Sequence, residues 1–511
     1  MPSLPDMLTG VLAIEPDAPA LEFRQTWRSW GALDAAARRL EAEFDRLGLG
    51  PGARIGVVVR NEAAFVPALI AIFRTGRCLV ILNGAAPPDR LAEDIASVRA
   101  PVLLIGESLD QTHAALAAAL GASGANVYVL RDDETAFHDA VTADAGAETR
   151  DYAPDTAIEM LTSGTTGKPK RIPLPSRTLE KALAGAASYE KGRSADAAPQ
   201  LRSGVQIVTA PLSHIGGITY LMTNLLAGRK VCLLEKFTVE GFRAAVVRHR
   251  PKIAGAPPAA LRMILDADIP KEDLSSLVAY RTGTAPLDVS LADAFYEKYG
   301  IPVLQNYGAT EFAGGVAGWT LADFKAHWAQ KKGSVGRLNA GIEGRVIAAE
   351  NGETVLSPGE EGLLELRGAN IGDGKTWTRT TDLVVLDTDG FLYVRGRADG
   401  AIIRGGFKIM PEDVIKALEA HPAIREAGVV ALTDRRLGQV PGAAFRVRAG
   451  QTAPSADALK TWLRERLLPY QVPPLIIEVE DFPRTTSLKI DQQALQALLE
   501  SAAAEGSALE A

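Results

Sequence analysis

Residues 160–174 read MLTSGTTGKPKRIPL, and this stretch organises the interpretation of the whole chain. Apolar residues lead into a run of hydroxyl-bearing residues and glycines at 162–167, and a cationic segment follows at 168–171. A loop rich in Gly, Ser and Thr can direct backbone N–H groups and hydroxyls towards an anion, while neighbouring cations add positive charge. The stretch therefore predicts a loop that holds polyphosphate.

The loop differs from the Walker P-loop, which has four residues between its glycines and a Ser or Thr after its lysine. Here only two residues separate Gly164 from Gly167, and Pro169 follows Lys168. The alternative interpretation is a flexible Gly/Ser/Thr linker. A linker seldom ends in an ordered Lys-Pro-Lys-Arg segment between two apolar runs, so a phosphate loop is favoured.

Composition limits the classes of function. The chain has 511 residues, more than one hydrophobic core usually supports, so two or three domains are expected. Its hydrophobic content of 47% and its charged content of 23% are typical of a globular protein. The net charge of −7 argues against nucleic acid as the main partner, so a polyanionic ligand has to meet locally placed cations.

The two cysteines, Cys78 and Cys232, lie in apolar runs, which predicts buried strand residues rather than a disulfide or a zinc site. The N-terminus has neither the basic start nor the long apolar segment of a secretory signal. No apolar run reaches the roughly 18 residues that a membrane-spanning helix requires. A cytoplasmic protein is expected.

Predicted strands and helices alternate through the first half of the chain. Strands are expected at 55–59, 78–82, 102–105, 127–130, 205–209, 231–234 and 253–256, and helices at 30–47, 62–74, 91–98, 218–226 and 242–249. This alternation indicates parallel βαβ units, whose ligands collect outside the carboxyl ends of the strands. Polar residues at 133–155 predict a surface connection before the phosphate loop.

The pattern changes after residue 333. Short strands separated by turn residues predict a small β-rich subdomain at about 333–397. An α+β region follows, with helices expected at 411–420 and 456–468, strands at 428–432 and 443–447, and a frayed tail at 501–511.

Further motifs follow the phosphate loop in a fixed order. They are PLSHIGGI at 211–218, RTGTAPL at 281–287, QNYGATE at 305–311, TTD at 380–382, GRADGAIIRGGFKIMPEDV at 396–414 and PRTTSLKID at 483–491. Together with the loop at 162–170, this series resembles the adenylate-forming superfamily of acyl-CoA synthetases, adenylation domains and luciferases. The resemblance covers nearly the whole chain, and the phosphate loop is its most specific mark.

The resemblance implies a fold and a reaction. The fold would be α/β, with a large N-terminal domain of α/β sheets, residues 1–397, that includes a small β-barrel-like subdomain at about 333–397. A smaller, mobile α+β domain, residues 398–511, would carry the catalytic lysine. The implied enzyme is an acid–thiol ligase, an AMP-forming acyl-CoA or aryl-CoA synthetase. It would use ATP and Mg²⁺ to adenylate a carboxylic acid, and would then transfer the acyl group to coenzyme A.

A carboxylate that attacks the α-phosphorus of ATP meets another anion, so charge must be neutralised and the reactants held in line. By the resemblance, Thr310 contacts the α-phosphate and Glu311 holds Mg²⁺, a hard cation suited to carboxylate oxygens. Outside this context Glu311 would be a solvated acid. The residues implied to hold the β- and γ-phosphates are Thr162, Ser163, Gly164, Thr165, Thr166, Gly167 and Lys168.

The nucleoside contacts are implied in the same way. Asp382 would accept hydrogen bonds from the ribose hydroxyls, Arg397 would make a second ribose or phosphate contact, and Tyr307 would stack on the base. The remaining nucleotide-binding candidates are small or polar residues on two motif loops: Gly283, Thr284, Ala285, Asn306 and Gly308.

Lys489 is expected to carry adenylation, because an ammonium that bridges the substrate carboxylate and the α-phosphate stabilises the charge of the transition state. The resemblance implies that the smaller domain then rotates about a hinge at Asp399, which removes Lys489 and brings a second loop to the thiol of coenzyme A. A solvated basic face is the alternative for the cations of that loop. The candidate contacts to coenzyme A are Arg404, Gly405, Gly406, Lys408 and Arg436.

The acyl group is assigned to the second motif. His214 fits the gate position of CoA ligases, although a lone histidine could equally be a hydrogen-bonded core residue. Ile215, Gly216 and Gly308 indicate an apolar pocket with open space for an aryl ring or for the acyl chain of a fatty acid. Amino-acid activation is disfavoured, because this loop lacks the Asp that pairs with a substrate ammonium.

Four positions depart from the family pattern: Arg171, Thr381 and Leu488 stand where glycine is usual, and Asp491 replaces a basic residue. None removes a group that the chemistry needs, so an active enzyme is expected. Two alternatives stay open, namely transfer to a carrier-protein pantetheine and a non-catalytic nucleotide-binding relative. The implied partners are a small carboxylic acid, ATP and coenzyme A, with an acyl carrier protein as the alternative acceptor, for a monomer or a homodimer.

Overall fold

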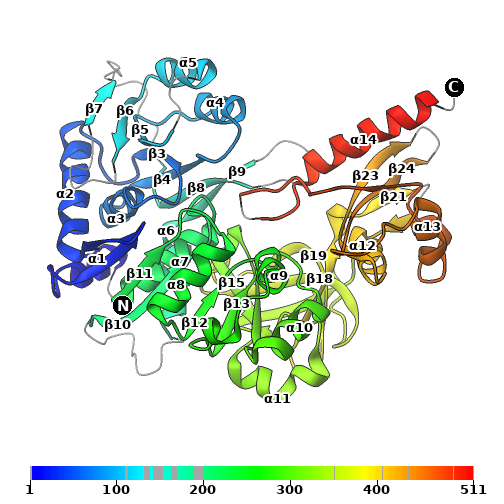
Figure 1. The fold of residues 1–511 in the computed structure, drawn as a ribbon. Helices are drawn as coiled ribbons and strands as arrows, with labels where there is room; N and C mark the ends of the chain where they lie inside the picture. The colour runs from blue at the N-terminus through cyan, green and yellow to red at the C-terminus, as the bar shows by residue number, and fades with distance from the viewer. Residues whose placement is uncertain are drawn as a thin grey trace. The chain divides into compact units, whose positions relative to one another are not determined.

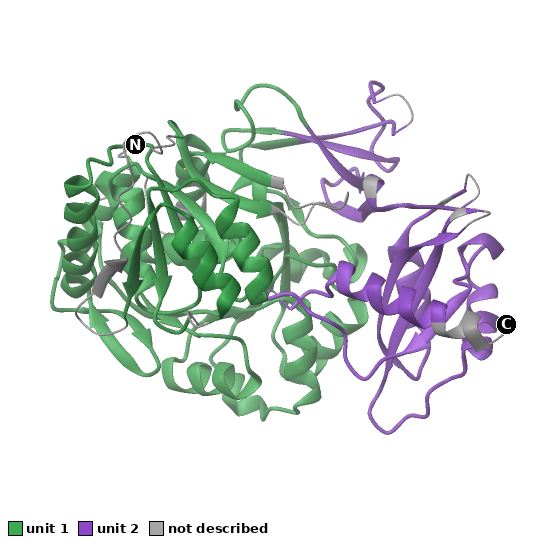
Figure 2. Cartoon of the chain, turned by 90° about the horizontal axis from the view of Figure 1, so that it is seen from above, with its two compact units in different colours: residues 1–343, 367–378 green, residues 344–366, 379–511 purple. Residues whose placement is uncertain are grey.

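The computed structural model describes residues 3–109, 113–131, 138–141, 153–162, 170–188, 199–349, 352–404, 407–434, 437–486 and 488–509. The chain divides into two compact units, residues 1–343 with 367–378 and residues 344–366 with 379–511 (Figure 2). Each unit has its own sheets and its own hydrophobic core. The domain boundary expected near residue 397 stays a prediction.

The largest sheet has seven strands and belongs to the first unit (Figure 1). Strands β3, β4, β5, β6 and β8 are parallel, which agrees with the predicted βαβ units. The helices before and between them are α2 (Trp30–Arg46), α3 (Phe65–Arg74), α4 (Pro88–Ala96) and α5 (Ala114–Ala122). The strand order is β7 (His138–Val141), β6 (Asn126–Leu130), β5 (Val102–Gly106), β3 (Arg54–Val59), β4 (Cys78–Asn83), β8 (Thr156–Thr162) and β9 (Lys170–Pro175).

Local sequence signals set the ends of α2. The hydroxyl of Ser29 accepts a hydrogen bond from the N–H of Ala32 (3.1 Å), which caps the first turn. At the other end, Gly48 has a φ of 66°, a left-handed conformation that glycine adopts without steric cost. The predicted helix at 30–47 with a stop at Gly48 is therefore confirmed.

The second sheet of the first unit joins segments that are far apart in the chain. Its order is β10 (Arg202–Val208), β11 (Arg229–Leu233), β1 (Pro19–Phe23) and β2 (Thr26–Ser29). Helices α7 (Ile215–Leu226) and α8 (Val239–His249) follow β10 and β11. The strands β10 and β11 and both helices were expected, whereas β1 and β2 were not predicted.

The third sheet of this unit carries two of the sequence motifs, at the ends of β13 and β14. Its order is β12 (Ile253–Gly255), β13 (Ala279–Thr282), β14 (Val303–Ala309), β15 (Gly314–Gly318) and β16 (Arg337–Leu338). Strands β12, β13 and β14 are parallel, and β15 returns antiparallel to β14. The remaining helices of the unit are α1 (Leu4–Leu12), α6 (Ser176–Ser188), α9 (Pro258–Asp266), α10 (Val289–Tyr299) and α11 (Leu321–Lys331).

A four-stranded sheet corresponds to the predicted β-rich subdomain. Its order is β17 (Ile342–Ile347), β18 (Glu361–Gly368), β19 (Thr378–Leu386) and β20 (Leu392–Arg397). The last sheet has the order β22 (Phe407–Ile409), β21 (Ile402–Arg404), β24 (Gly438–Val447) and β23 (Ile424–Asp434), and β25 (Leu475–Glu478) pairs with β24. It is accompanied by α12 (Pro411–Glu419), α13 (Ala456–Arg464) and α14 (Gln492–Leu509).

Two local predictions are wrong. Part of the surface connection expected at 133–155 is strand β7, which pairs with β6. The tail expected to fray from residue 501 continues as helix α14 to Leu509. Alanine has the highest helix propensity, and Leu495 and Leu499 bury this helix against the second unit's core, so both effects favour the helix.

The predicted burial of the two cysteines in strands is confirmed, because Cys78 and Cys232 are both buried and lie in strands β4 and β11. Burial raises the pKa of each thiol to about 12. Within the described ranges, no helix is both long and apolar enough to cross a membrane.

Candidate active site

Strands β8 and β9 bracket the predicted phosphate loop. Thr162 is paired with Lys170 at the end of their antiparallel ladder, so the loop begins and ends at neighbouring backbone positions. The side chains of Thr162, Asp399 and Lys408 are outside the description. The predicted site residues that lie wholly outside the described residues are Ser163, Gly164, Thr165, Thr166, Gly167, Lys168, Gly405, Gly406 and Arg436.

The strand that leaves the phosphate loop lies against the turn that carries the predicted metal ligand. This turn, η3 (Thr310–Phe312), contacts β9. Phe312 is buried and anchors the turn, while the carboxylate of Glu311 is exposed. Ala313 ends the turn with a φ of 56° and donates its N–H to the carbonyl of Thr310 (3.1 Å). The structure therefore brings the turn with Thr310 and Glu311 against β9, the strand that follows the loop.

Two threonines tie together the strand ends that precede the other motif loops. Oγ1 of Thr209, just after β10, donates to the carbonyl of Gly255 at the end of β12 (2.8 Å). Oγ1 of Thr282, at the end of β13, donates to the carbonyl of Ala256 (2.8 Å). The loops that begin at Pro211 and Gly283 therefore leave the same edge of the first unit, which is where ligands collect in α/β sheets.

The glycines of these loops are explained largely by packing within the unit. A Cβ on Gly283 would overlap the amide oxygen of Asn306, and a Cβ on Gly308 would overlap the carbonyl of Gly314. Thr284 adopts a left-handed φ of 68° in the same turn as Gly283. Asn306 is exposed and Tyr307 half-buried on β14. Their contacts to a nucleotide, with those of Ala285, stay predictions.

The loop assigned to the acyl group turns into helix α7. His214 is half-buried and precedes the helix, and its carbonyl accepts hydrogen bonds from the N–H groups of Gly217 (3.0 Å) and Ile218 (3.2 Å). A Cβ on Gly217 would overlap the carbonyl of Pro211, whereas one on Gly216 would meet no atom within 4 Å. Open space therefore borders Gly216, and the neighbouring Ile215 is buried.

In the second unit, the two ribose candidates lie directly opposite each other. Asp382 on β19 and Arg397 on β20 are paired in the antiparallel ladder. Nη2 of Arg397 donates to Oγ1 of Thr381 (2.8 Å), and the N–H of Asp382 donates to Oγ1 of Thr380 (3.1 Å). Asp399, the predicted hinge residue, follows β20 in the turn Ala398–Gly400.

Lys489 lies on a tight hairpin of the second unit. Arg484 and Ile490 form a β-bridge, and the N–H of Thr485 donates to the carbonyl of Lys489 (2.8 Å). The side chain of Lys489 is exposed. Desolvation lowers the pKa of its ammonium. Asp491, which departs from the family pattern, caps α14 by accepting from the N–H of Ala494 (3.1 Å).

Arg404 is held by its own unit. Its Nη1 donates to the carbonyls of Tyr470 (2.7 Å) and Val472 (3.2 Å). Next to it, the exposed ring of Phe407 stacks on Tyr470, with 4.7 Å between the ring centroids. The sequence interpretation did not single out either aromatic residue. A contact of Arg404 with coenzyme A stays a prediction.

Arg171 also has a structural partner. Its Nη1 donates to the carbonyl of Ile81 in β4 (3.2 Å), and burial lowers its pKa. This arginine, on β9, is therefore hydrogen-bonded to another strand of the same sheet.

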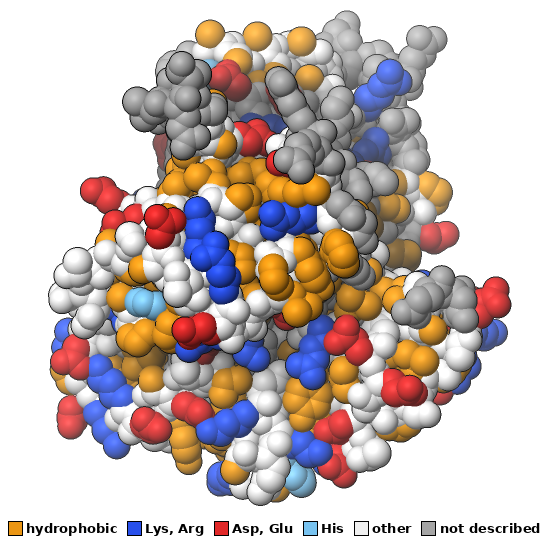
Figure 3. Space-filling view, turned by 90° about the vertical axis from the view of Figure 1, so that its right-hand side faces the viewer, with side chains coloured by type: hydrophobic (Ala, Val, Ile, Leu, Met, Phe, Trp, Pro, Cys, Tyr) orange, Lys and Arg blue, Asp and Glu red, His pale blue; other side chains and the backbone are white. Residues whose placement is uncertain are grey.

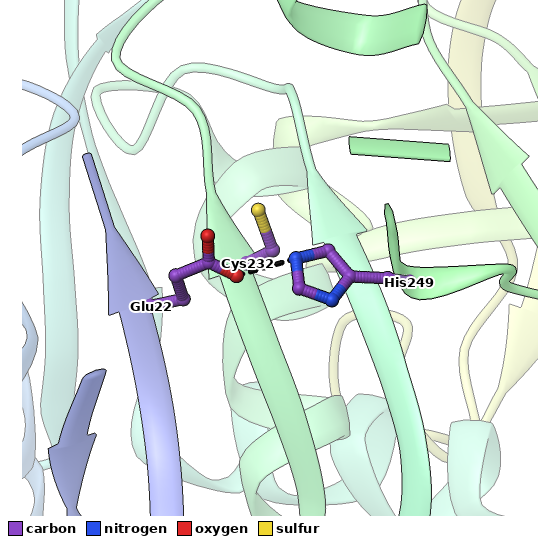
Figure 4. Close-up of side chains that lie close together, drawn as sticks. All are labelled: Glu22, Cys232 and His249. Atoms are coloured by element: carbon purple, nitrogen blue, oxygen red, sulfur yellow. Dashed lines mark ion pairs between the residues drawn. The ribbon is translucent and has the colours of Figure 1, made fainter. Parts of the chain in front are cut away.

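Glu22, Cys232 and His249 form a buried polar cluster that the sequence did not predict (Figure 4). Their potential ligand atoms lie within 4.8 Å of one another, and Glu22 and Cys232 are register partners in β1 and β11. However, Nη2 of Arg248 contacts one oxygen of Glu22 (2.8 Å) and Nε2 of His249 contacts the other, while burial lowers the pKa of that imidazole. Through Arg248 and His249, the cluster links β1 to α8.

On the face drawn in Figure 3, basic and acidic side chains are interspersed among apolar ones.

Two family models match most of the chain. The AMP-binding enzyme family matches residues 11–374, and the AMP-binding enzyme C-terminal domain matches residues 416–489. The chain belongs to the AMP-binding enzyme family. This membership confirms the predicted resemblance to adenylate-forming enzymes and the predicted class of acid–thiol ligases.

Curated relatives of this AMP-binding enzyme match along its whole length. The 2-succinylbenzoate–CoA ligase of Bacillus cereus is 27% identical over 98% of this chain and 99% of its own. The ligase of the same name from Bacillus velezensis is 29% identical over 97% of this chain and 98% of its own.

Solved structures confirm the predicted α/β fold class. The o-succinylbenzoate CoA synthetase (MenE) of Bacillus subtilis, in complex with the acyl-adenylate intermediate OSB-AMP, has a TM-score of 0.74 and 26% identity, and the match covers 96% of this chain and 98% of that one. ATP-bound MatB of Rhodopseudomonas palustris has a TM-score of 0.80 and 22% identity, and the match covers 97% of this chain and 98% of that one. The latter likeness shows the fold alone.

Proposed function

We propose that this AMP-binding enzyme is an ATP-dependent acid–CoA ligase whose substrate is an aromatic carboxylic acid of the 2-succinylbenzoate type. The observation that carries the proposal is the full-length match to relatives with that name, 98% of this chain against 99% of the relative. A match of this extent includes every motif loop and both units.

The first unit would bind the triphosphate and the acid. Mg²⁺ would supply positive charge to the phosphates, and the exposed carboxylate of Glu311 fits a hard cation. Thr310, next to it on η3, would contact the α-phosphate. The open space beside Gly216, with buried Ile215 and half-buried His214 around it, would receive the aryl group.

The second unit would supply the ribose contacts and the catalytic ammonium. Asp382 would accept the ribose hydroxyls, with Arg397 opposite it in the ladder. Lys489 would bridge the attacking carboxylate and the α-phosphate, where its charge opposes the negative charge that accumulates in the transition state. Because its hairpin holds the backbone by hydrogen bonds, the long side chain can reach the reactants from a fixed base.

Coenzyme A is the favoured acceptor, because the relatives are named as CoA ligases. A rotation about Asp399 would exchange Lys489 for the segment around Lys408 between the two half-reactions. We further propose a cytoplasmic enzyme, whose substrates reach it as free small molecules.

The test is pyrophosphate release from the purified protein with ATP and Mg²⁺ over a panel of acids. The panel holds 2-succinylbenzoate, benzoate, cinnamate, malonate and fatty acids of three lengths, each with and without coenzyme A. We expect the highest kcat/KM with 2-succinylbenzoate, together with a CoA thioester in the products. A higher value with a fatty acid would overturn the substrate class, and thiol consumption only with a holo carrier protein would overturn the acceptor.

A further inference from the structure

Thr381 is a departure from the family pattern that the backbone accommodates without strain. It lies on β19 between Thr380 and Asp382, where the pattern has glycine. Its φ lies outside the left-handed region, in contrast to that of Leu488. The position therefore does not require glycine, and a side chain can take part in the site.

The hydroxyl of Thr381 has a defined partner. Nη2 of Arg397 donates to Oγ1 of Thr381 over 2.8 Å, although both side chains are exposed. A glycine at residue 381 would have no side-chain oxygen to accept this hydrogen bond. Arg397 is the ladder partner of Asp382, and the bond ties its guanidinium to the residue that directly precedes Asp382.

The neighbouring threonine holds the other member of the pair. Oγ1 of Thr380 accepts from the N–H of Asp382 (3.1 Å) and donates to the carbonyl of Leu364 on β18 (3.0 Å). Two consecutive threonines thus fix the two residues that are paired across the ladder. Thr380 holds the backbone of Asp382, and Thr381 holds the side chain of Arg397.

We propose that Thr381 is a positioning residue that orients Arg397 for the ribose–phosphate part of the nucleotide. The inference rests on the proposed function, because the nucleotide contact of Arg397 is itself part of that proposal. A long exposed arginine loses rotamer freedom when it binds a ligand, and an anchor formed before binding reduces that loss. Thr381 therefore acts on the affinity for ATP more than on the rate of the chemical step.

The first experiment compares Thr381→Val, which removes the acceptor at nearly constant shape, with Thr381→Ser, which keeps it. The readout is the KM for ATP in ATP–pyrophosphate exchange. Because hydrogen bonds to charged groups are stronger than neutral ones, Thr381→Val should raise this KM about three- to tenfold. Thr381→Ser should keep KM and kcat within about twofold of the unmodified protein. Thr433→Val, an exposed threonine in a strand of the same unit, is the matched control and should change neither.

A double-mutant cycle with Arg397→Met separates positioning from a structural effect. If Thr381 acts through Arg397, Thr381→Val adds no further increase in KM when Arg397 is already replaced. An equal increase in both backgrounds, or no increase in either, would overturn the inference.

The proposed function and this inference fail in different ways. Absence of pyrophosphate exchange with every acid would contradict the proposed function. In that event the Kd for ATP, measured by calorimetry on the same four proteins of the cycle, tests the inference directly. Normal exchange with an unchanged KM in Thr381→Val would contradict only the inference.

Discussion

Nη1 of Arg484 donates a hydrogen bond to the carbonyl of Leu488 over 3.2 Å, and this bond pins a strained residue directly before Lys489. Leu488 has a φ of 61°, in the left-handed region that L-residues with side chains avoid. Arg484 is itself fixed, because its Nη2 contacts Oε2 of Glu426 at 2.6 Å. The family pattern has glycine at this position, and the conformation explains why.

Leu488→Gly should relax this turn, and Leu488→Ala is the matched control that removes the side chain but keeps the strain. We expect the free energy of unfolding of the glycine variant to exceed that of the alanine variant by about 1 kcal/mol. Glycine avoids the steric cost of the left-handed conformation, and this gain is larger than the loss from the greater conformational entropy of glycine in the unfolded chain. Urea denaturation of both variants measures the difference. Equal stability of the two would contradict the assigned strain.

Lys489→Ala should reduce adenylation by at least about 100-fold, as expected for the loss of a charge aimed at the transition state. Transfer of the acyl group from preformed acyl-adenylate to coenzyme A should stay within about threefold, because the lysine is assigned to the first half-reaction alone. Lys416→Ala, an exposed lysine on α12, is the control. An equal loss in both half-reactions would show that Lys489 has another role.

Glu311→Gln should raise the Mg²⁺ concentration needed for half-maximal adenylation by about tenfold, since an amide is a weaker ligand than a carboxylate for a hard cation. Pyrophosphate release measured across a Mg²⁺ titration gives this value. Glu297→Gln, an exposed acid on α10, should leave the titration unchanged. An unaltered titration in Glu311→Gln would exclude Glu311 as the metal ligand.

Glu412 predicts a pH dependence of stability. Burial raises the pKa of this carboxyl above its ordinary value of 4.5, and the adjacent Asp413 adds to the effect. The folded state then holds its proton more tightly than the unfolded state, so the ionised group destabilises the fold as pH rises above about 4.5 towards the raised value.

Glu412→Gln should therefore raise the Tm at pH 7 relative to the unmodified protein, and the two should converge at pH 4. Glu419→Gln would be a poor control, because Oε1 of Glu419 accepts a hydrogen bond from Ala427. Lys416→Gln, on the same helix, is a better one. A constant difference in Tm across this pH range would show that the carboxyl does not titrate as argued.

The sequence predicted the parallel part of the fold well, because periodic apolar segments such as those at 55–59 and 78–82 are decided locally. It did not predict β1, whose partner β11 lies about two hundred residues later. No local pattern carries information about such a distant edge. The helical end of α14 was missed because the helix propensity of its alanines was given too little weight, and because the burial of Leu495 and Leu499 that anchors the helix depends on the packed core.

The site residues could be proposed only from the order of the motifs. The structure adds the contacts between them, such as the one between β9 and the turn of Glu311, and the ladder that pairs Asp382 with Arg397. It also changes how two glycines are understood, because Gly283 and Gly308 make room for other parts of the protein. Side-chain partners of this kind have no signature in a single sequence.

The pairing of β1 with β11 has a consequence for how the protein is made. A nascent chain that has emerged only as far as α6 contains β1 and β2 but lacks their neighbour, since β11 begins at Arg229. Until that strand leaves the ribosome, Leu21 and Phe23 have no sheet to join and the edge of β1 stays open to other chains. Non-local pairing of this kind is slow and exposed to aggregation. The second sheet should therefore form after the seven-stranded sheet, whose last strand, β9, ends at Pro175.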